Sequence, residues 1–187
     1  MTRKIAKHII DWEDKKRNYS DEEKIVLQYG IELFLNSAIK TILYIIGAII
    51  IGRVKETLFA LVIWCIIRKQ SGGRHAKKDF VCFVISGSAI FFPVMVSSAL
   101  KLTLKMIVIS VIVINLIYML YAPYDEYFYA EERKNEKKIA KYKSIVCSNF
   151  ALIIGYLCET KYLNIAIIIL LEQGGLIIHR EKGDRNE

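Results

Sequence analysis

The residues from position 80 to position 100 read FVCFVISGSAIFFPVMVSSAL, and none of them carries a formal charge. A bilayer core about 30 Å thick requires about 20 consecutive, mostly apolar residues when it is crossed by a helix. This stretch meets both conditions. It therefore predicts a membrane-spanning helix.

Five further apolar blocks complete the pattern, at positions 31–52, 57–67, 106–122, 144–158 and 162–178. Apolar residues make up 54% of the chain, and they come in blocks rather than in the alternation of a half-buried strand. We therefore expect an all-α, polytopic integral membrane protein with about six hydrophobic helical segments. Positions 1–187 are expected to form a single membrane-embedded domain, with 1–24 as a cytoplasmic or interfacial N-terminal segment.

The distribution of basic residues predicts the orientation. The segments outside the six blocks, taken alternately, hold 21 and 5 Lys and Arg residues, and Lys40 lies inside the first block. Because cytoplasmic loops carry the excess of Lys and Arg, this alternation predicts six crossings with both termini in the cytoplasm. The blocks at 57–67 and 144–158 are short for a full crossing. Four spans with two re-entrant segments are therefore an alternative with the same orientation.

The N-terminal segment contains a helix-start signal. Ser20 and Glu23 form the Ser-x-x-Glu pattern of a capping box, so a helix is expected to begin there and to run into the first span. Before it, Ile5, Ile9 and Trp12 are interspersed with charged residues. This pattern fits either a short amphipathic helix on the inner leaflet or a solvated tail.

Motifs that carry chemistry are few. The sequence holds three histidines but no HExxH pattern, no Walker motif and no Gly-x-Ser-x-Gly elbow, which argues against a zinc protease, an NTPase or a serine hydrolase. No metal or cofactor is expected. Cys65, Cys147 and Cys158 lie in apolar blocks, where cysteine behaves as a small hydrophobic residue. Nucleophilic chemistry would therefore rest on Cys82 with His75.

His75 and Cys82 are seven residues apart, where a basic loop meets the block at 80–100. On one continuous helix they would lie about 10.5 Å apart along the axis, beyond the roughly 3 Å of a hydrogen bond. The pair can work only if the chain folds back, and Gly72-Gly73 supplies a flexible break. Asp79 would then cap a helix that begins near position 80. Cys82 would lie in its first turn, where the helix dipole favours a thiolate.

Other charged residues are candidates for supporting roles. Asp79 is placed either to accept the ring N–H of His75 or only to cap the helix. Glu172 lies inside the last apolar block, where a carboxylate is costly and indicates a function, unless it sits near the interface. Arg74, with the two lysines that follow at 77 and 78, adds positive charge close to Cys82.

The sequence around this pair resembles the signature of a known family, the accessory gene regulator protein B family. The matching residues are Arg68, the run Ser71-Gly72-Gly73-Arg74-His75-Ala76, and Cys82. Two further motifs agree: Tyr29-Gly30-Ile31-Glu32 at the entry to the first span and Tyr121-Ala122-Pro123 before the large basic loop. The resemblance covers nearly the whole chain. One departure is the basic loop, where family members usually carry a second proline and positions 124–143 have none.

Members of that family are bacterial membrane cysteine endopeptidases that process quorum-sensing propeptides. The resemblance implies that Cys82 is the nucleophile and His75 its general base, on the cytoplasmic side of the cell membrane. Arg68, Gly73 and Arg74 would support them as residues of the same motif. The implied substrate is a small amphipathic signalling propeptide, and the implied product is a thiolactone or lactone ring. A homodimer is also expected.

Six basic residues gather in the large loop, just before the fifth block. They are Arg133, Lys134, Lys137, Lys138, Lys141 and Lys143. We expect this cluster to bind anionic lipid headgroups, with the acidic tail of a propeptide as a second ligand. Nucleic acid is not expected to bind there, because the loop lies against the membrane.

The competing function is that of a non-enzymatic membrane protein, such as a transporter component or an assembly partner. In that case Lys40 and Glu172 would be important for function instead of Cys82 and His75.

Overall fold

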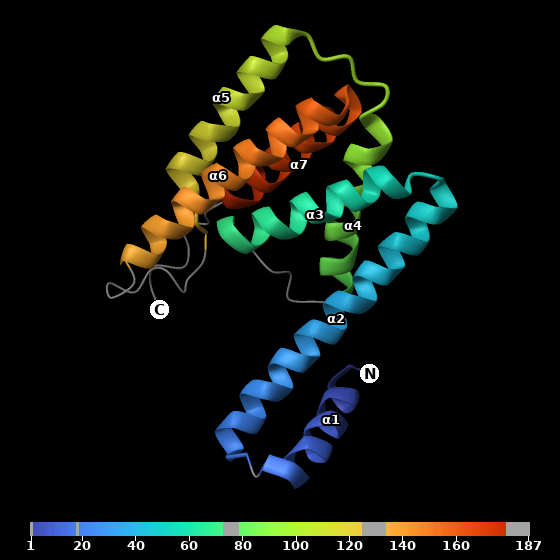
Figure 1. Cartoon of the computed structure of the whole chain (residues 1–187), viewed down its shortest axis with the longest axis vertical. Coiled ribbons are helices and arrows are strands. Elements are labelled where there is room, and N and C mark those ends of the chain that lie inside the picture. Colours follow the sequence, from blue (N-terminus) through green and yellow to red (C-terminus); the bar gives the residue numbers. More distant parts are fainter. Residues whose placement is uncertain (1, 18, 73–78, 125–133, 179–187) are drawn as a thin grey trace. The chain divides into compact units, whose positions relative to one another are not determined.

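The computed structural model describes residues 2–17, 19–72, 79–124 and 134–178 (Figure 1). Within these ranges the chain forms seven helices and no strand, as the sequence predicts. The chain divides into two compact units, Met1–Gly52 and Arg53–Glu187, here called the N-terminal and C-terminal units. The expectation of a single domain stays a prediction.

The N-terminal unit is built on a long helix, α2 (Asp21–Ile51). The predicted capping box is present: the Ser20 hydroxyl accepts a hydrogen bond from the Glu23 backbone N–H (3.3 Å), and the Glu23 carboxylate accepts one from the Ser20 N–H (2.9 Å). A helix of 31 residues is about 46 Å long, which exceeds the roughly 30 Å of a bilayer core. Only part of α2 can therefore lie in hydrocarbon.

The first helix, α1 (Thr2–Arg17), packs beside the N-terminal half of α2 (Figure 1). Ala6 and Ile10 are buried in this packing, whereas Ile5, Ile9 and Trp12 stay exposed. The helical alternative for the N-terminal segment is thus confirmed. Its exposed apolar stripe suits an interface between water and lipid, and its location on the inner leaflet stays a prediction.

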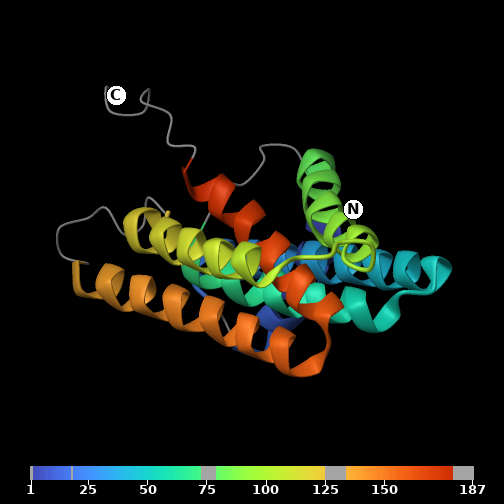
Figure 2. The ribbon, with the colours of Figure 1, turned by 90° about the horizontal axis from the view of Figure 1, so that it is seen from above.

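The C-terminal unit contains five helices arranged around the last one. They are α3 (Val54–Ser71), α4 (Asp79–Val96), α5 (Leu104–Tyr121), α6 (Lys134–Cys158) and α7 (Thr160–Ile178). Helix α7 packs against all four others and crosses them obliquely (Figure 2). It is also the most buried helix, with Ile165, Ala166, Ile169 and Leu170 fully enclosed.

Helix α6 approaches its neighbours through small residues. Ala140, Ser144, Ser148 and Ala151 recur at helical spacing and are all buried, and the hydroxyl of Ser144 donates back to the Ala140 carbonyl at 2.9 Å. Small residues allow close helix contact where no water drives association. At the end of this stripe, a side chain at Gly155 would lie only 2.9 Å from the Cα of Leu163, so the α6–α7 hairpin closes on a glycine.

A reciprocal amide pair joins α5 to α6. Asn149 donates to the Asn115 side-chain oxygen at 2.8 Å, and Asn115 donates to that of Asn149 at 3.2 Å. Each amide also donates to a carbonyl of its own helix four residues earlier. Both amides are therefore satisfied without water, which an apolar environment requires.

The first residues of α7 bind the segment that follows α4. The Asn164 side chain, almost fully buried, donates to the carbonyls of Ser97 (2.9 Å) and Leu100 (2.8 Å), which follow the end of α4. Nearby, Lys161 forms ion pairs with Glu56 (3.1 Å) and Glu159 (3.2 Å). The beginning of α7 thus fixes the end of α4 and the beginning of α3.

Among the described residues, three helices are long and apolar enough to cross a membrane: α2, α5 and α7. The apolar part of α4, Phe80–Val96, is slightly shorter. The two short blocks at 57–67 and 144–158 lie within the continuous helices α3 and α6, which extend into charged flanks. The number of crossings and the orientation of the termini stay predictions.

The closeness of α6 and α7 at Gly155 yields a stability prediction. Gly155→Ala should destabilise the C-terminal unit by about 1–3 kcal/mol, because the new methyl group meets Leu163 backbone atoms that cannot move aside. Thermal unfolding in detergent measures the effect. The matched control is Gly175→Ala in α7, where nothing lies within 4 Å and where alanine favours the helix. Equal stability of both variants would contradict the close approach.

Candidate active site

The site begins where α3 ends. Ser71 is the last residue of α3, and the N–H of Gly72 donates to the Arg68 carbonyl at 3.1 Å. Gly72 has φ +69° and ψ −155°, a conformation that only glycine adopts without strain. The chain therefore turns sharply at Gly72, three residues before His75.

A segment distant in sequence meets this turn. The Tyr124 N–H donates to the Ser71 carbonyl at 2.7 Å, and Tyr124 forms an isolated parallel bridge with Gly72. A Cβ atom at Gly72 would overlap the Tyr124 carbonyl oxygen. Ala122 and Pro123, just before Tyr124, are buried. Two motifs quoted for the family resemblance are thus brought together in space, which their sequence separation did not predict.

A buried glutamine holds the same turn from α7. Gln173 is fully buried, and its amide donates to the Ser71 hydroxyl at 3.0 Å and to the Gly72 carbonyl at 2.7 Å. The Ser71 hydroxyl in turn donates to the Ile67 carbonyl at 2.9 Å. The sequence analysis missed Gln173. In the sequence, Gln173 is a polar amide within an apolar block, which is a signal for a function. Only its charged neighbour Glu172 was selected as a candidate.

Arg68 lies one turn before this junction. Its guanidinium carbon is 5.4 Å from the centroid of the Trp64 ring, and the residue is half-buried. Helix α3, which carries Arg68, packs against α4, which carries Cys82. Two residues of the predicted motif, Arg68 and Cys82, thus lie on helices that are in contact.

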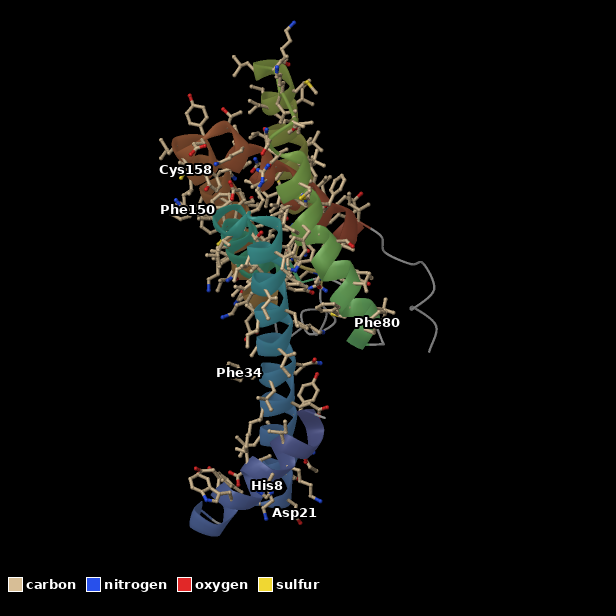
Figure 3. The ribbon with its side chains drawn as sticks, turned by 90° about the vertical axis from the view of Figure 1, so that its right-hand side faces the viewer. His8, Asp21, Phe34, Phe80, Phe150 and Cys158 are labelled. Carbon is tan, nitrogen blue, oxygen red and sulfur yellow. The ribbon has the colours of Figure 1, made fainter. Side chains whose placement is uncertain are left out.

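Cys82 lies in the first turn of α4, as the sequence predicts, because the helix begins at Asp79. It is half-buried, whereas Phe80 beside it is 75% exposed (Figure 3). All four cysteines are free thiols. Cys82 is therefore a free, partly accessible thiol at the positive end of a helix dipole.

The other members of the predicted motif lie outside the described residues. These are His75, Gly73 and Arg74, together with the side chain of Asp79. The contact between His75 and Cys82 stays a prediction.

Glu172 occupies a different face of α7 from Gln173, since successive helix residues are about 100° apart. It is half-buried, and its Oε2 atom is buried without a hydrogen-bond partner among the described residues. Its supporting role in the site stays a prediction. Within the described ranges, no group of three His, Cys, Asp or Glu residues could hold a metal ion.

Comparison with known proteins places the chain in a family. The model of the family described as Accessory gene regulator B matches residues 2–177. The chain belongs to this family. No solved structure matches it. The sequence resemblance is thereby confirmed, and family membership supports a role in processing accessory gene regulator peptides.

Curated relatives from two clostridia agree. Two Clostridium perfringens proteins, from strain 13 and strain SM101, carry the provisional name AgrB-like protein. Each is 28% identical to this chain, and each match covers 88% of this chain and 80% of the relative. A protein with the same provisional designation from Clostridium acetobutylicum is 33% identical over 104 residues. That match spans 55% of this chain and about half, 49%, of the relative. Family membership and the apolar helices together indicate a membrane protein.

The turn at Gly72 yields a second prediction. Gly72→Ala should lower the free energy of unfolding of the C-terminal unit by several kcal/mol, because it adds both backbone strain and an overlap with the Tyr124 carbonyl. The matched control is Gly52→Ala, also at positive φ (+72°) but with nothing within 4 Å. The control should lose only the roughly 1–2 kcal/mol of a left-handed alanine. If both variants lost the same stability, Tyr124 would not pack on Gly72.

Proposed function

We propose that this protein is a membrane cysteine endopeptidase that cleaves a small signalling propeptide and promotes its cyclisation. One observation carries the proposal: Cys82 is a free, half-buried thiol near the start of α4, and α4 packs against α3, the helix that carries Arg68 and ends at the anchored junction at Gly72. Family membership supports the same chemistry. A thiol close to a cation and a helix N-terminus is suited to nucleophilic attack.

The first step is acyl transfer to the enzyme. His75 removes the proton of the Cys82 thiol, and the sulfur attacks the carbonyl carbon of the scissile peptide bond. A tetrahedral intermediate forms and collapses: the C–N bond breaks, and the leaving amine takes the proton from the His75 imidazolium. The N-terminal part of the propeptide is then held on Cys82 as a thioester.

The second step releases a ring. His75 removes the proton of a Cys or Ser side chain within the bound peptide, and that side chain attacks the thioester carbonyl. The Cys82 sulfur leaves as thiolate and takes the proton back from the His75 imidazolium. The product is a thiolactone or a lactone. Hydrolysis competes with ring closure, so the site has to limit water. A half-buried nucleophile near the end of an apolar helix is suited to that demand.

The cellular arrangement follows from the charge pattern. We place the site at the cytoplasmic face of a bacterial cell membrane, with six crossings, because the basic segments alternate along the sequence. The basic cluster around the start of α6 would bind anionic lipid and receive the acidic end of the propeptide. A homodimer is the proposed assembly.

Substitution of the nucleophile tests the proposal. Cys82→Ala should abolish propeptide cleavage while leaving membrane insertion intact, because it removes only the attacking sulfur. His75→Ala should do the same. The measurement is the conversion of a synthetic amphipathic propeptide, with a central Cys and an acidic end, by the purified protein in vesicles.

Cys147→Ala is the matched control, since Cys147 is also half-buried and free but lies in the middle of α6. It should process the propeptide at the rate of the unchanged protein. Mass spectrometry of the unchanged protein should detect a peptide thioester on Cys82 that hydroxylamine removes. Normal cleavage by Cys82→Ala would end the proposal.

Gln173 is proposed as a positioning residue that acts through the turn preceding His75. Gln173→Met keeps the side-chain size but removes both donated hydrogen bonds, so it should lower kcat by about tenfold or more with little change in KM. The unpaired Ser71 and Gly72 acceptors should also cost about 1–3 kcal/mol of stability.

Asn164→Leu separates positioning from general destabilisation. Asn164 is also a buried amide of α7 that donates two hydrogen bonds, but at the other end of the helix. Its loss should reduce stability to a similar degree and leave kcat unchanged when both variants are assayed well below their Tm. An equal fall in kcat for both would assign Gln173 a purely structural role.

A further inference from the structure

A surface groove runs between α3 and α6, here called the α3–α6 groove. Its volume is about 640 Å³, and every residue that lines it is apolar apart from the thiol of Cys147. The walls are formed by six residues at helical spacing, of which five are exposed and one, Ile154, is half-buried. They are Leu58, Val62 and Ile66 of α3, and Val146, Phe150 (Figure 3) and Ile154 of α6.

The two walls run in opposite directions. Lys161, three residues after the end of α6, pairs with Glu56 at the beginning of α3, so the end of α6 lies beside the beginning of α3. The groove-lining part of each helix covers eight residue steps, or about 12 Å of helix axis. The end of the groove nearest Ile66 is therefore also the end nearest Val146.

At that end of the groove, each of the two helices carries a lysine just beyond its groove-lining residues. Lys69 follows Ile66 by three residues on α3, and Lys143 precedes Val146 by three residues on α6. Residues three apart share a helix face, and both lysines are exposed. The opposite end carries both signs of charge, since Arg53, Lys55 and Lys161 lie there with Glu56 and Glu159. The groove thus offers an apolar interior with two lysines at one end and charges of both signs at the other.

We propose that the α3–α6 groove binds a phospholipid with an anionic headgroup, its acyl chain lying in the groove and its phosphate between Lys69 and Lys143. Charge complementarity selects the headgroup. The dimensions suit an acyl chain, because 640 Å³ spread along about 12 Å gives a cross-section of about 50 Å². This site does not depend on the proposed peptidase activity.

Protection of Cys147 by lipid tests the site. The full-length protein with Cys65→Ala, Cys82→Ala and Cys158→Ala retains one thiol, inside the groove, and its rate of modification by a maleimide is measured in detergent. Added phosphatidylglycerol should slow the modification at a concentration roughly 20- to 30-fold lower than phosphatidylcholine with the same acyl chains. This ratio is expected from two lysine contacts at the membrane surface.

Charge variants identify the headgroup contacts. In the double variant Lys69→Gln, Lys143→Gln, phosphatidylglycerol should protect no better than phosphatidylcholine. The matched control, Lys101→Gln with Lys105→Gln, also removes two exposed lysines, and it should behave like the parent. Equal protection by both lipids in the parent protein would overturn the proposal, as would an equal loss in the two double variants.

Two other occupants are distinguishable outcomes that would also overturn it. If a second copy of the chain fills the groove, protection will rise with protein concentration without added lipid. If another segment of the same chain fills it, Cys147 will be protected at any concentration and unresponsive to lipid. Native mass spectrometry provides a second measurement, since the parent should retain one phosphatidylglycerol that the Lys69, Lys143 variant loses.

Discussion

The C-terminal unit depends on a rule of apolar environments: each polar group at a helix end needs a partner within the protein. Helix α7 supplies two such partners from buried side-chain amides. Asn164 satisfies carbonyls after the end of α4, and Gln173 satisfies the end of α3. Nine residues, or about 13 Å of helix, separate the two amides. A single central helix therefore fixes the ends of two others, which explains why α7 is the most enclosed element.

The same contacts of α7 also fix the backbone at the candidate site. Gly72 is held from one side by Gln173 and from the other by Tyr124, so the end of α3 is fixed. Arg68 and Cys82 belong to two helices that both pack on α7. Helix packing and these hydrogen bonds therefore position the described residues of the candidate site.

Local features of this fold were predictable from the sequence, whereas long-range partners were not. The capping box at Ser20 and the start of α4 just before Cys82 depend on residues three or four positions apart, and both predictions are confirmed. Gln173 was overlooked because its partner Ser71 lies 102 residues away. The apolar block at 57–67 is shorter than helix α3 (Val54–Ser71), because the helix continues through the charged Arg68. In the structure its charge stays within the helix, and its guanidinium lies over the Trp64 ring.

The amide pair between α5 and α6 has a consequence for how this molecule can vary. Asn115 and Asn149 lock the two helices in one longitudinal alignment, because a shift of a single residue would break both contacts. The segment that joins α5 to α6 therefore does not need to determine that alignment. A change in the length or composition of that segment should therefore leave the contact between α5 and α6 in place.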